Sequence, residues 1–536
     1  MAEPFDVVVV GGGHNGLVAA GLLARRGARV TVLERRSTVG GAATTEQPWG
    51  PAFKMSALSY VVSLIPPEIV RELDLVRHGY KIYPQNGYFV PYRDGRALQL
   101  PDHDPKRRFA QIEQFSRADA DAYQRWDAWL GGLADVLGPL LETIPPRIGS
   151  LRPRDLVDQA RLAWTLRRLG IGGIGDVTRL FTMSIADLLD EWFTSPQMQG
   201  VLAVSGVIGT WAGPRSPGTA YVMAHHKVGD AGGQIGSWGF PEGGMGALSD
   251  ALRAAAVANG AKVRTDAPVA RIDVRGGRTR GVTLESGEEL RADIVIAATH
   301  PKITFLDQIE RDALPSEFVT AIEHWKTRSG TVKVNVAVDR LPEFTAKPGF
   351  DPEVHGGTIV LAESLDQVER AFQDAVAGRS AALPFADICI PSVFDPTLAP
   401  AGQHVVSMFT QWVPHTWAAS PDAEELGLYA DRVIARVDAV APGFSSSILH
   451  RQVIGPYEME HEYGLIGGNI FHGELSPDQL FHMRPEPGYA DFRTPIDGLY
   501  QASSATHGGG GVTGIPGLNA TRQIMSDRAR SKWRRA

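Results

Sequence analysis

Three glycines near the start of the chain, Gly11, Gly13 and Gly16, stand in the spacing Gly-x-Gly-x-x-Gly. They follow the β-branched run Val7–Val10, which is typical of a strand buried on both faces, and they precede an Ala/Leu-rich run that predicts a helix over 15–26. Gly11 makes a tight turn, Gly13 allows a pyrophosphate to approach the backbone closely, and Gly16 allows the helix to pack on the sheet. The pattern therefore predicts a dinucleotide whose phosphates lie at a helix N-terminus.

An acidic residue and a second glycine pair narrow the choice of dinucleotide. Glu34 closes a second strand predicted over 29–33, where its carboxylate can accept hydrogen bonds from a ribose and would repel the 2′-phosphate of NADP. Gly40 and Gly41 follow directly and provide a second place where a ligand can approach the backbone. Such a pair is typical of flavoproteins and rare in nicotinamide dehydrogenases, so it favours FAD; a plain turn is the alternative.

The segment 497–525 also indicates a bound ligand. It predicts a strand over 498–502, a flexible turn at Gly508–Gly511 and a helix from Gly514 onward. A helix N-terminus directed at the pyrimidine end of a flavin would stabilise the negative charge of the reduced ring. A purely structural glycine-rich loop is the alternative.

Side chains for proton transfer are harder to assign. The candidates, in decreasing order, are His507, His472, His225 and His226. For each of them a hydrogen-bonded structural imidazole is an equal alternative. Tyr60 and Met55 are expected on the substrate side, with packing in the core as the rival interpretation.

Two further segments have competing interpretations. Gly170, Gly172 and Gly175 repeat the first glycine spacing, but they follow a helical pattern and not a strand, so a helix stop and loop is predicted in place of a second nucleotide site. Residues 152–168 are Arg-rich and amphipathic, as in a solvated helix face or in a surface that leans on a membrane or admits an apolar substrate.

Composition excludes several classes of function. The 536 residues exceed one ordinary core and predict two domains, while a net charge of −7 argues against nucleic acid as a partner. A single cysteine, Cys389, excludes a dithiol redox centre, and the histidines show no metal-ligand spacing. With no run of membrane-spanning length and no signal-peptide pattern, a cytoplasmic location is expected. A peripheral membrane contact, a mitochondrial location in a eukaryote and a homo-oligomer stay open.

Four segments together carry a family resemblance: 7–46, 240–252, 463–485 and 498–524. Through them nearly the whole chain resembles the phytoene desaturase-like FAD-dependent oxidoreductases, and above all the branch called pyridine nucleotide-disulfide oxidoreductase domain-containing protein 2. The resemblance implies FAD as the cofactor. It also implies these FAD-binding residues: Gly11, Gly12, Gly13, His14, Asn15, Gly16, Glu34, Arg35, Gly40, Gly41, Ala42, Val269, Gly511, Val512, Thr513 and Gly514.

The fold class expected from the resemblance is α/β, with a discontinuous Rossmann-type FAD-binding domain and an interleaved α+β substrate domain. This is the two-domain architecture of glutathione reductases and amine oxidases. The FAD-binding domain is predicted to comprise residues 1–75, 240–305 and 488–536. The substrate or cap domain is predicted to comprise residues 76–239 and 306–487.

The function expected is hydride transfer between flavin N5 and a C–H or C=C group of a hydrophobic, isoprenoid or lipid-like substrate. A flavin amine oxidase is one alternative; an aromatic cage and a lysine near N5 would identify it, and neither the C-terminal segment nor the His472 segment supplies such a lysine. A redox-neutral flavin isomerase and a non-catalytic flavin-binding interaction protein are the others.

Overall fold

The N-terminal strand β1 lies at the centre of a parallel sheet whose strands come from three separate parts of the chain. The computed structural model describes residues 5–229, 231 and 236–535, apart from the side chains of residues 154 and 530–535. The sheet has the order β18-β12-β1-β2-β9. Its strands are β1 (Phe5–Val10), β2 (Val30–Leu33), β9 (Lys262–Arg264), β12 (Glu289–Ala297) and β18 (Leu499–Gln501). Val7–Val10 are buried, which confirms the predicted first strand.

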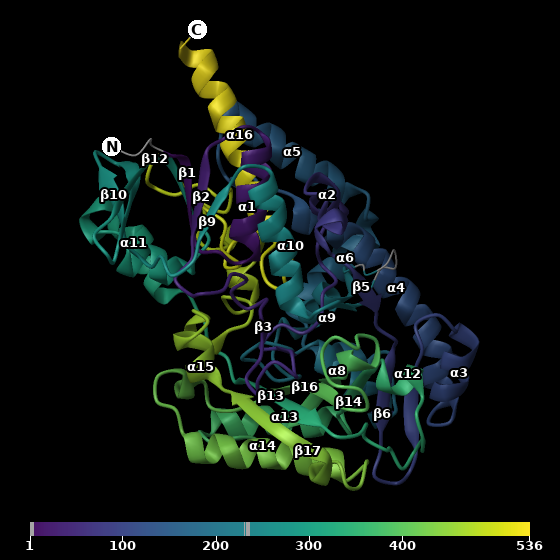
Figure 1. Cartoon of the computed structure of the whole chain (residues 1–536). Helices are drawn as coiled ribbons and strands as arrows, with labels where there is room; N and C mark the ends of the chain where they lie inside the picture. Colours follow the sequence, from purple (N-terminus) through teal and green to yellow (C-terminus); the bar gives the residue numbers. More distant parts are fainter. Residues whose placement is uncertain (1–4, 230, 232–235, 536) are drawn as a thin grey trace.

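Helices cover this sheet, and α1 packs against two others from distant parts of the chain (Figure 1). The three are α1 (His14–Arg25), α10 (Met245–Ala258) and α16 (Ile515–Arg535). On the other side of β12, β10 (Val269–Arg275) and β11 (Arg278–Leu284) continue the sheet in antiparallel pairing. The first α-helix and the last one therefore both begin at the same edge of the sheet, where the parallel strands end.

A second, mixed sheet of seven strands forms the other half of the molecule, in the order β17-β13-β16-β15-β14-β6-β7. Its strands are β6 (Tyr88–Pro91), β7 (Ala97–Leu100), β13 (Thr331–Val338), β14 (Thr358–Leu361), β15 (Phe385–Cys389), β16 (His404–Gln411) and β17 (Ile448–Ile454). Its helices include α13 (Leu365–Val376) and α14 (Ala423–Asp438), which lie together at one end of the molecule (Figure 1). Two short pairs, β3 (Thr45–Glu46) with β4 (Met55–Ser56) and β5 (Ile82–Pro84) with β8 (Gly239–Pro241), lie outside both sheets.

Most of the remaining helices come from the segment between β7 and β8. They are α3 (Pro105–Glu113), α4 (Arg117–Glu142), α5 (Pro153–Arg167), α6 (Gly170–Thr182), α7 (Ile185–Asp190), α8 (Pro196–Ser205) and α9 (Thr219–Lys227). The others are α2 (Pro67–Glu72), α11 (Ser316–His324), α12 (Pro352–His355) and α15 (Pro456–His461). None of the helices among the described residues has both the length and the apolar character needed to span a bilayer.

The loop predicted at the second glycine spacing is wrong. Gly170 adopts a left-handed φ of +63° and ends the α5 region, as a helix stop should, but α6 begins at this residue and includes Gly172 and Gly175. Ile171, at the second position of α6, starts an apolar spacing of three that favours a helix over a loop. The predicted domain boundaries stay predictions, although the strands of the first sheet all lie within the segments assigned to the FAD-binding domain.

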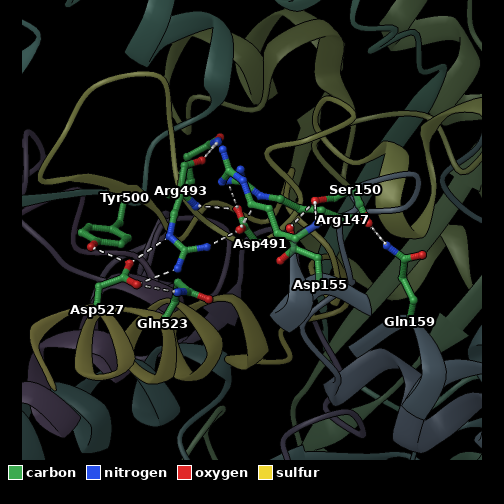
Figure 2. Close-up of polar contacts among 11 residues, drawn as sticks. Arg147, Ser150, Asp155, Gln159, Asp491, Arg493, Tyr500, Gln523 and Asp527 are labelled. Atoms are coloured by element: carbon green, nitrogen blue, oxygen red, sulfur yellow. Dashed lines mark hydrogen bonds and ion pairs between the residues drawn. The ribbon is translucent and has the colours of Figure 1, made fainter. Parts of the chain in front are cut away.

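A polar network fixes the connection between α4 and α5 to the C-terminal part of the chain (Figure 2). Arg147 Nε donates to Asp491 at 2.9 Å, and Arg493 pairs with both Asp491 and Asp527. Tyr500 donates its hydroxyl to Asp527 at 3.0 Å. Burial alone would raise the pKa of Asp527, but its hydrogen bonds with Arg493 hold that pKa below the ordinary value.

Candidate active site

The three glycines of the first motif have different roles: Gly11 and Gly13 lie in the loop between β1 and α1, and Gly16 lies in the first turn of α1. Gly11 adopts a φ of +100°, in the left-handed region that favours glycine. A Cβ on Gly16 would overlap the carbonyl oxygen of Gly11 and lie 3.1 Å from the Cβ of Ala298, so the helix packs on the sheet only because no side chain is present. Gly13 is different, because it has an ordinary φ of −68° and no atom of the described chain within 4 Å of a Cβ added there.

A cleft of about 370 Å³ opens beside Gly13 and runs along the carboxyl ends of β1, β2 and β12. The predicted FAD-binding residues that line it are Gly11, Gly13, His14, Asn15, Glu34, Arg35, Gly40, Gly41, Ala42 and Val269. The remaining glycine of the first loop, Gly12, lies behind this surface and donates its N–H to the Glu34 carboxylate at 2.8 Å. The second glycine pair meets the first loop there, since the N–H of Gly40 donates to the Gly12 carbonyl at 2.9 Å.

Buried polar atoms without a hydrogen-bond partner lie around this cleft. Among the described residues they include His14 Nε2, Asn15 Oδ1, Gln308 Oε1 and His472 Nδ1. Such atoms each cost about 1–3 kcal/mol when nothing bonds them, so native proteins rarely leave them without a partner. A polar ligand in the cleft removes that cost. Together with the bare backbone at Gly13 and the free amides of the α1 N-terminus, these atoms fit the pyrophosphate and polar chain of FAD.

Three of the predicted FAD-binding residues make other contacts. The Arg35 guanidinium lines the cleft but donates to the carbonyls of His461 and Glu462, at 3.2 and 3.0 Å, where α15 ends. Thr513 Oγ1 donates to the Gly508 carbonyl at 2.6 Å and accepts the Ile515 N–H at 3.1 Å, so it stabilises the start of α16. Gly514 packs against Ile69 and Val18 and lies outside the lining of both cavities at this edge of the sheet. A helix therefore begins after Gly514, as predicted. Of the four residues from Gly511 to Gly514 that were predicted to bind FAD, only Gly511 and Val512 line one of these two cavities.

A second cavity, of about 140 Å³, continues from the cleft and shares four of its residues, which are His14, Ala42, His472 and Ser504. One wall is the glycine loop that includes Gly510 and Gly511. The other walls are mainly apolar and aromatic: Tyr60, Tyr88, Trp238, Phe409, Ile470 and Phe471. A substrate in this cavity would lie next to whatever part of the dinucleotide occupies the shared region. Tyr60 is placed as predicted, whereas Met55 is buried in a separate apolar cluster with Phe53.

The floor of the second cavity carries a buried polar cluster on the mixed sheet. Lys333, on β13, donates from Nζ to Ser407 on β16 and lies 3.9 Å from the ring centre of Tyr60. Tyr60 donates its hydroxyl to Asp387, on β15, at 3.1 Å. The Cys389 thiol lies on the same strand and accepts from Gln85 Nε2 at 3.3 Å. These groups are the polar part of a largely apolar cavity, and all of them are buried except Tyr60, which is half-buried.

Burial brings the pKa values of two of these groups close to neutral pH. It lowers the pKa of Lys333 from 10.5 to about 7 and raises the pKa of Asp387 from 3.8 to about 6. Burial also raises the pKa of the Cys389 thiol well above its usual value, so this cysteine stays a thiol. Lys333 is therefore the side chain of the cavity best placed to exchange a proton at physiological pH.

The histidine candidates separate into two groups. His472 lies at the junction of cleft and cavity with an unpaired Nδ1, and burial lowers its pKa to about 3, so its imidazole is neutral. His226 lines the second cavity, and its Nδ1 lies 2.7 Å from the Val222 carbonyl. His507 does not reach the cleft: its Nε2 lies 2.9 Å from the Leu140 carbonyl, on the far side of the glycine loop. His225 faces that far side too.

Sequence reasoning missed Lys333, Asp387 and Gln308. The sequence did hold a signal for Lys333, because this residue interrupts the apolar run of 331–338. The structure shows that run as a strand, Thr331–Val338, in which every residue is buried. A cation in the middle of such a strand must have a buried partner or a function. Gln308 gave no such signal, since it directly follows a short helical segment (Ile303–Asp307) and reaches the cleft only through its packing on β10, where it donates to the Val269 carbonyl at 2.9 Å.

Two-domain flavoprotein oxidoreductases are built in this way, with FAD held at the edge of a parallel sheet and the substrate held between it and a second sheet. Comparison with known families identifies the group. The profile described as flavin containing amine oxidoreductase matches residues 202–517, and that described as NAD(P)-binding Rossmann-like domain matches residues 9–66. The chain belongs to the flavin-containing amine oxidoreductase family and is an FAD-dependent oxidoreductase. The predictions of fold class and cofactor are thus confirmed.

Individual relatives agree with this assignment. The chain is 41% identical to the rat (Rattus norvegicus) protein named pyridine nucleotide-disulfide oxidoreductase domain-containing protein 2, over 98% of this chain and 94% of that one. It is 24% identical to the phytoene desaturase of Phycomyces blakesleeanus, over 98% and 85%. The crystal structure of cyclohexylamine oxidase from Brevibacterium oxydans superposes with a TM-score of 0.58 at 17% identity, over 98% and 100% of the two chains, and shows a shared fold. The family resemblance carried by the four sequence segments is therefore confirmed.

Proposed function

We propose that the chain transfers hydride between FAD and a C–H or C=C group of a hydrophobic, isoprenoid or lipid-like substrate. The observation that supports this most is the cavity next to the FAD cleft, whose walls are mainly apolar and aromatic and which shares His14 and His472 with the cleft. The similarity to a phytoene desaturase agrees with it. Bound FAD supplies the acceptor for two electrons and one hydrogen.

Desaturation removes one hydrogen of the substrate as a hydride and a neighbouring one as a proton, so the chain must exclude water and accept a proton. The aromatic walls, including Phe409 and Phe471, exclude water. Lys333 Nζ can accept the proton, because burial keeps a large share of this amine neutral at physiological pH. Asp387 and Tyr60 hold the polar end of the cavity and can bind a single polar group of the substrate.

Amine oxidation is the second candidate, and one specific observation favours it. The lysine whose absence from the C-terminal and His472 segments argued against an amine oxidase is present on β13, as Lys333, in a cavity with several aromatic side chains. Asp387 supplies an anionic partner for a protonated amine on the same floor.

Anaerobic stopped-flow mixing of the FAD-loaded protein separates these functions. Loss of the flavin absorbance band with nitrogen-free isoprenoids or lipids supports the proposal, and loss with amines alone supports amine oxidation. Conversion of substrate only after prior reduction of FAD, without use of an acceptor, indicates an isomerase. No loss of the band with any compound, together with no reoxidation of reduced FAD by any of them, indicates a flavin-binding protein without turnover and overturns the proposal.

The variants Lys333→Met and Lys333→Arg test the role of the amine. A general base contributes about 10²–10⁴-fold to the rate of its step, so both variants are expected to slow flavin reduction by that order. Arginine keeps the positive charge but stays protonated, so it cannot restore a base. Rescue by arginine would show that Lys333 acts through its charge and not through proton transfer.

A further inference from the structure

The outward faces of α5 and α6 carry apolar side chains that no other described part of the chain covers. Trp164 on α5 is 62% exposed and Ile171 on α6 is 95% exposed. Among the described residues of α5 none is buried, and α6 buries only Leu180. Both helices lie on the outside of the molecule, beside α4 (Figure 1). Large apolar side chains exposed together on one face are typical of an interaction surface, so this pair of helices is expected to meet a partner.

Charge indicates what that partner is. Residues 152–168 hold five arginines and two aspartates, a local excess of three positive charges in a chain whose net charge is −7. The Arg167 guanidinium lies 5.2 Å from the ring centre of Trp164, so cationic and aromatic groups share one face. That combination is typical of helices that lie in the interface of an anionic membrane. A two-fold contact between copies of this chain would instead bring the same arginines together.

The other side of the two helices covers an apolar cavity of about 320 Å³. Its lining includes Leu137, Leu140, Leu162, Leu166, Val177 and Phe181. At its inner end the buried His225 has two ring nitrogens without a hydrogen-bond partner among the described residues. The His225 ring lies 5.9 Å from that of Phe471, which lines the cavity beside the FAD cleft. His225 and Phe471 therefore stand between the two cavities.

We propose that the outer face of α5 and α6 docks on an anionic lipid bilayer, and that the cavity beneath these helices receives the apolar chain of a ligand drawn from it. The polar network of Figure 2 holds the base of this surface in place, and Gln159 of α5 ties the helix to it by donating to the carbonyls of Arg147 and Ser150 at 2.8 and 3.0 Å. Docking depends on this surface and not on the reaction, so the experiments below measure binding to vesicles and do not require the enzyme to turn over a substrate.

A fluorescent label on the surface tests the proposal in the FAD-loaded full chain. Ile171→Cys provides one accessible thiol, because the natural Cys389 is buried, and Leu428→Cys on α14, 48% exposed, is the matched control. With vesicles that contain phosphatidylglycerol, an environment-sensitive dye at 171 is expected to shift to shorter wavelength while the dye at 428 does not. The shift should be lost with phosphatidylcholine alone or in high salt.

Co-sedimentation gives an independent measure of the same contact. Trp164→Ser combined with Ile171→Ser is expected to lower the partition coefficient onto phosphatidylglycerol vesicles by about tenfold or more, because two large apolar side chains no longer enter the interface. Leu428→Ser should leave it unchanged, and all variants should keep the FAD absorbance and melting temperature of the parent. No shift at 171, equal shifts at both sites, or a shift that grows with protein concentration in the absence of vesicles overturns the proposal; the last result indicates a second copy of the chain.

Discussion

The substitution Gly13→Ala separates the demands of the fold from the demands of FAD. Gly13 has a φ that alanine adopts without strain, and the added methyl group would meet no atom of the described chain within 4 Å. The unfolding free energy without FAD is therefore expected to change by less than about 1 kcal/mol. The methyl group would point into the cleft, where it prevents the phosphates from reaching the free amides at the α1 N-terminus.

The expected loss of affinity follows from those amides. A hydrogen bond to a charged group contributes about 1.5–3 kcal/mol, so displacing the pyrophosphate from one of them should raise the Kd for FAD by about 10–100-fold. Titration of FAD into the stripped protein, followed by quenching of flavin fluorescence, measures this. Where stripping is incomplete, the rise in Tm produced by added FAD reports the same difference.

Gly16→Ala is the matched control, since it adds the same methyl group at a position where the protein itself has no room. Its Cβ would overlap the Gly11 carbonyl oxygen and press on Ala298 and Val9. It is expected to destabilise the fold by about 1–3 kcal/mol or more, whether or not FAD is present. If Gly13→Ala binds FAD as tightly as the parent, or destabilises the FAD-free chain as much as Gly16→Ala does, the assignment of the cleft to the pyrophosphate is refuted.

Two other predictions concern charge. Burial lowers the pKa of Lys333 from 10.5 to about 7, so the fold penalises the charged form of this side chain. Lys333→Met should therefore raise the unfolding free energy most below about pH 7, and progressively less as the pH rises towards 10.5. A gain in unfolding free energy that does not vary with pH contradicts this. Asp491→Asn should cost about 2–4 kcal/mol in chemical denaturation, since it leaves Arg147 and Arg493 without their shared, largely buried carboxylate. Arg161→Gln, which breaks an exposed pair with Asp158, is the control and should cost no more than about 0.5 kcal/mol; equal losses would contradict the role given to the network.

His507 shows how a position next to a motif can mislead. It precedes the glycine loop in sequence, yet Gly508, Gly510 and Gly511 all adopt left-handed φ values and turn the chain back on itself. As a result Gly510 and Gly511 face the cavity beside the FAD cleft, while His507 faces the apolar cavity beneath α5 and α6. The sequence predicts a flexible turn here, but the direction of each side chain depends on the dihedral angles that the turn adopts in the folded protein.

The sequence by itself determined the dinucleotide site, because that site depends on neighbours along the chain. A strand, a turn of glycines and a helix N-terminus lie within one short segment, and steric limits on the backbone leave few conformations for it. Only the tertiary structure decided the chemistry of the cavity. Lys333, Asp387 and Tyr60 come from β13, β15 and a loop far from both, and they meet because long-range strand pairing sets which side chains share one face of a sheet.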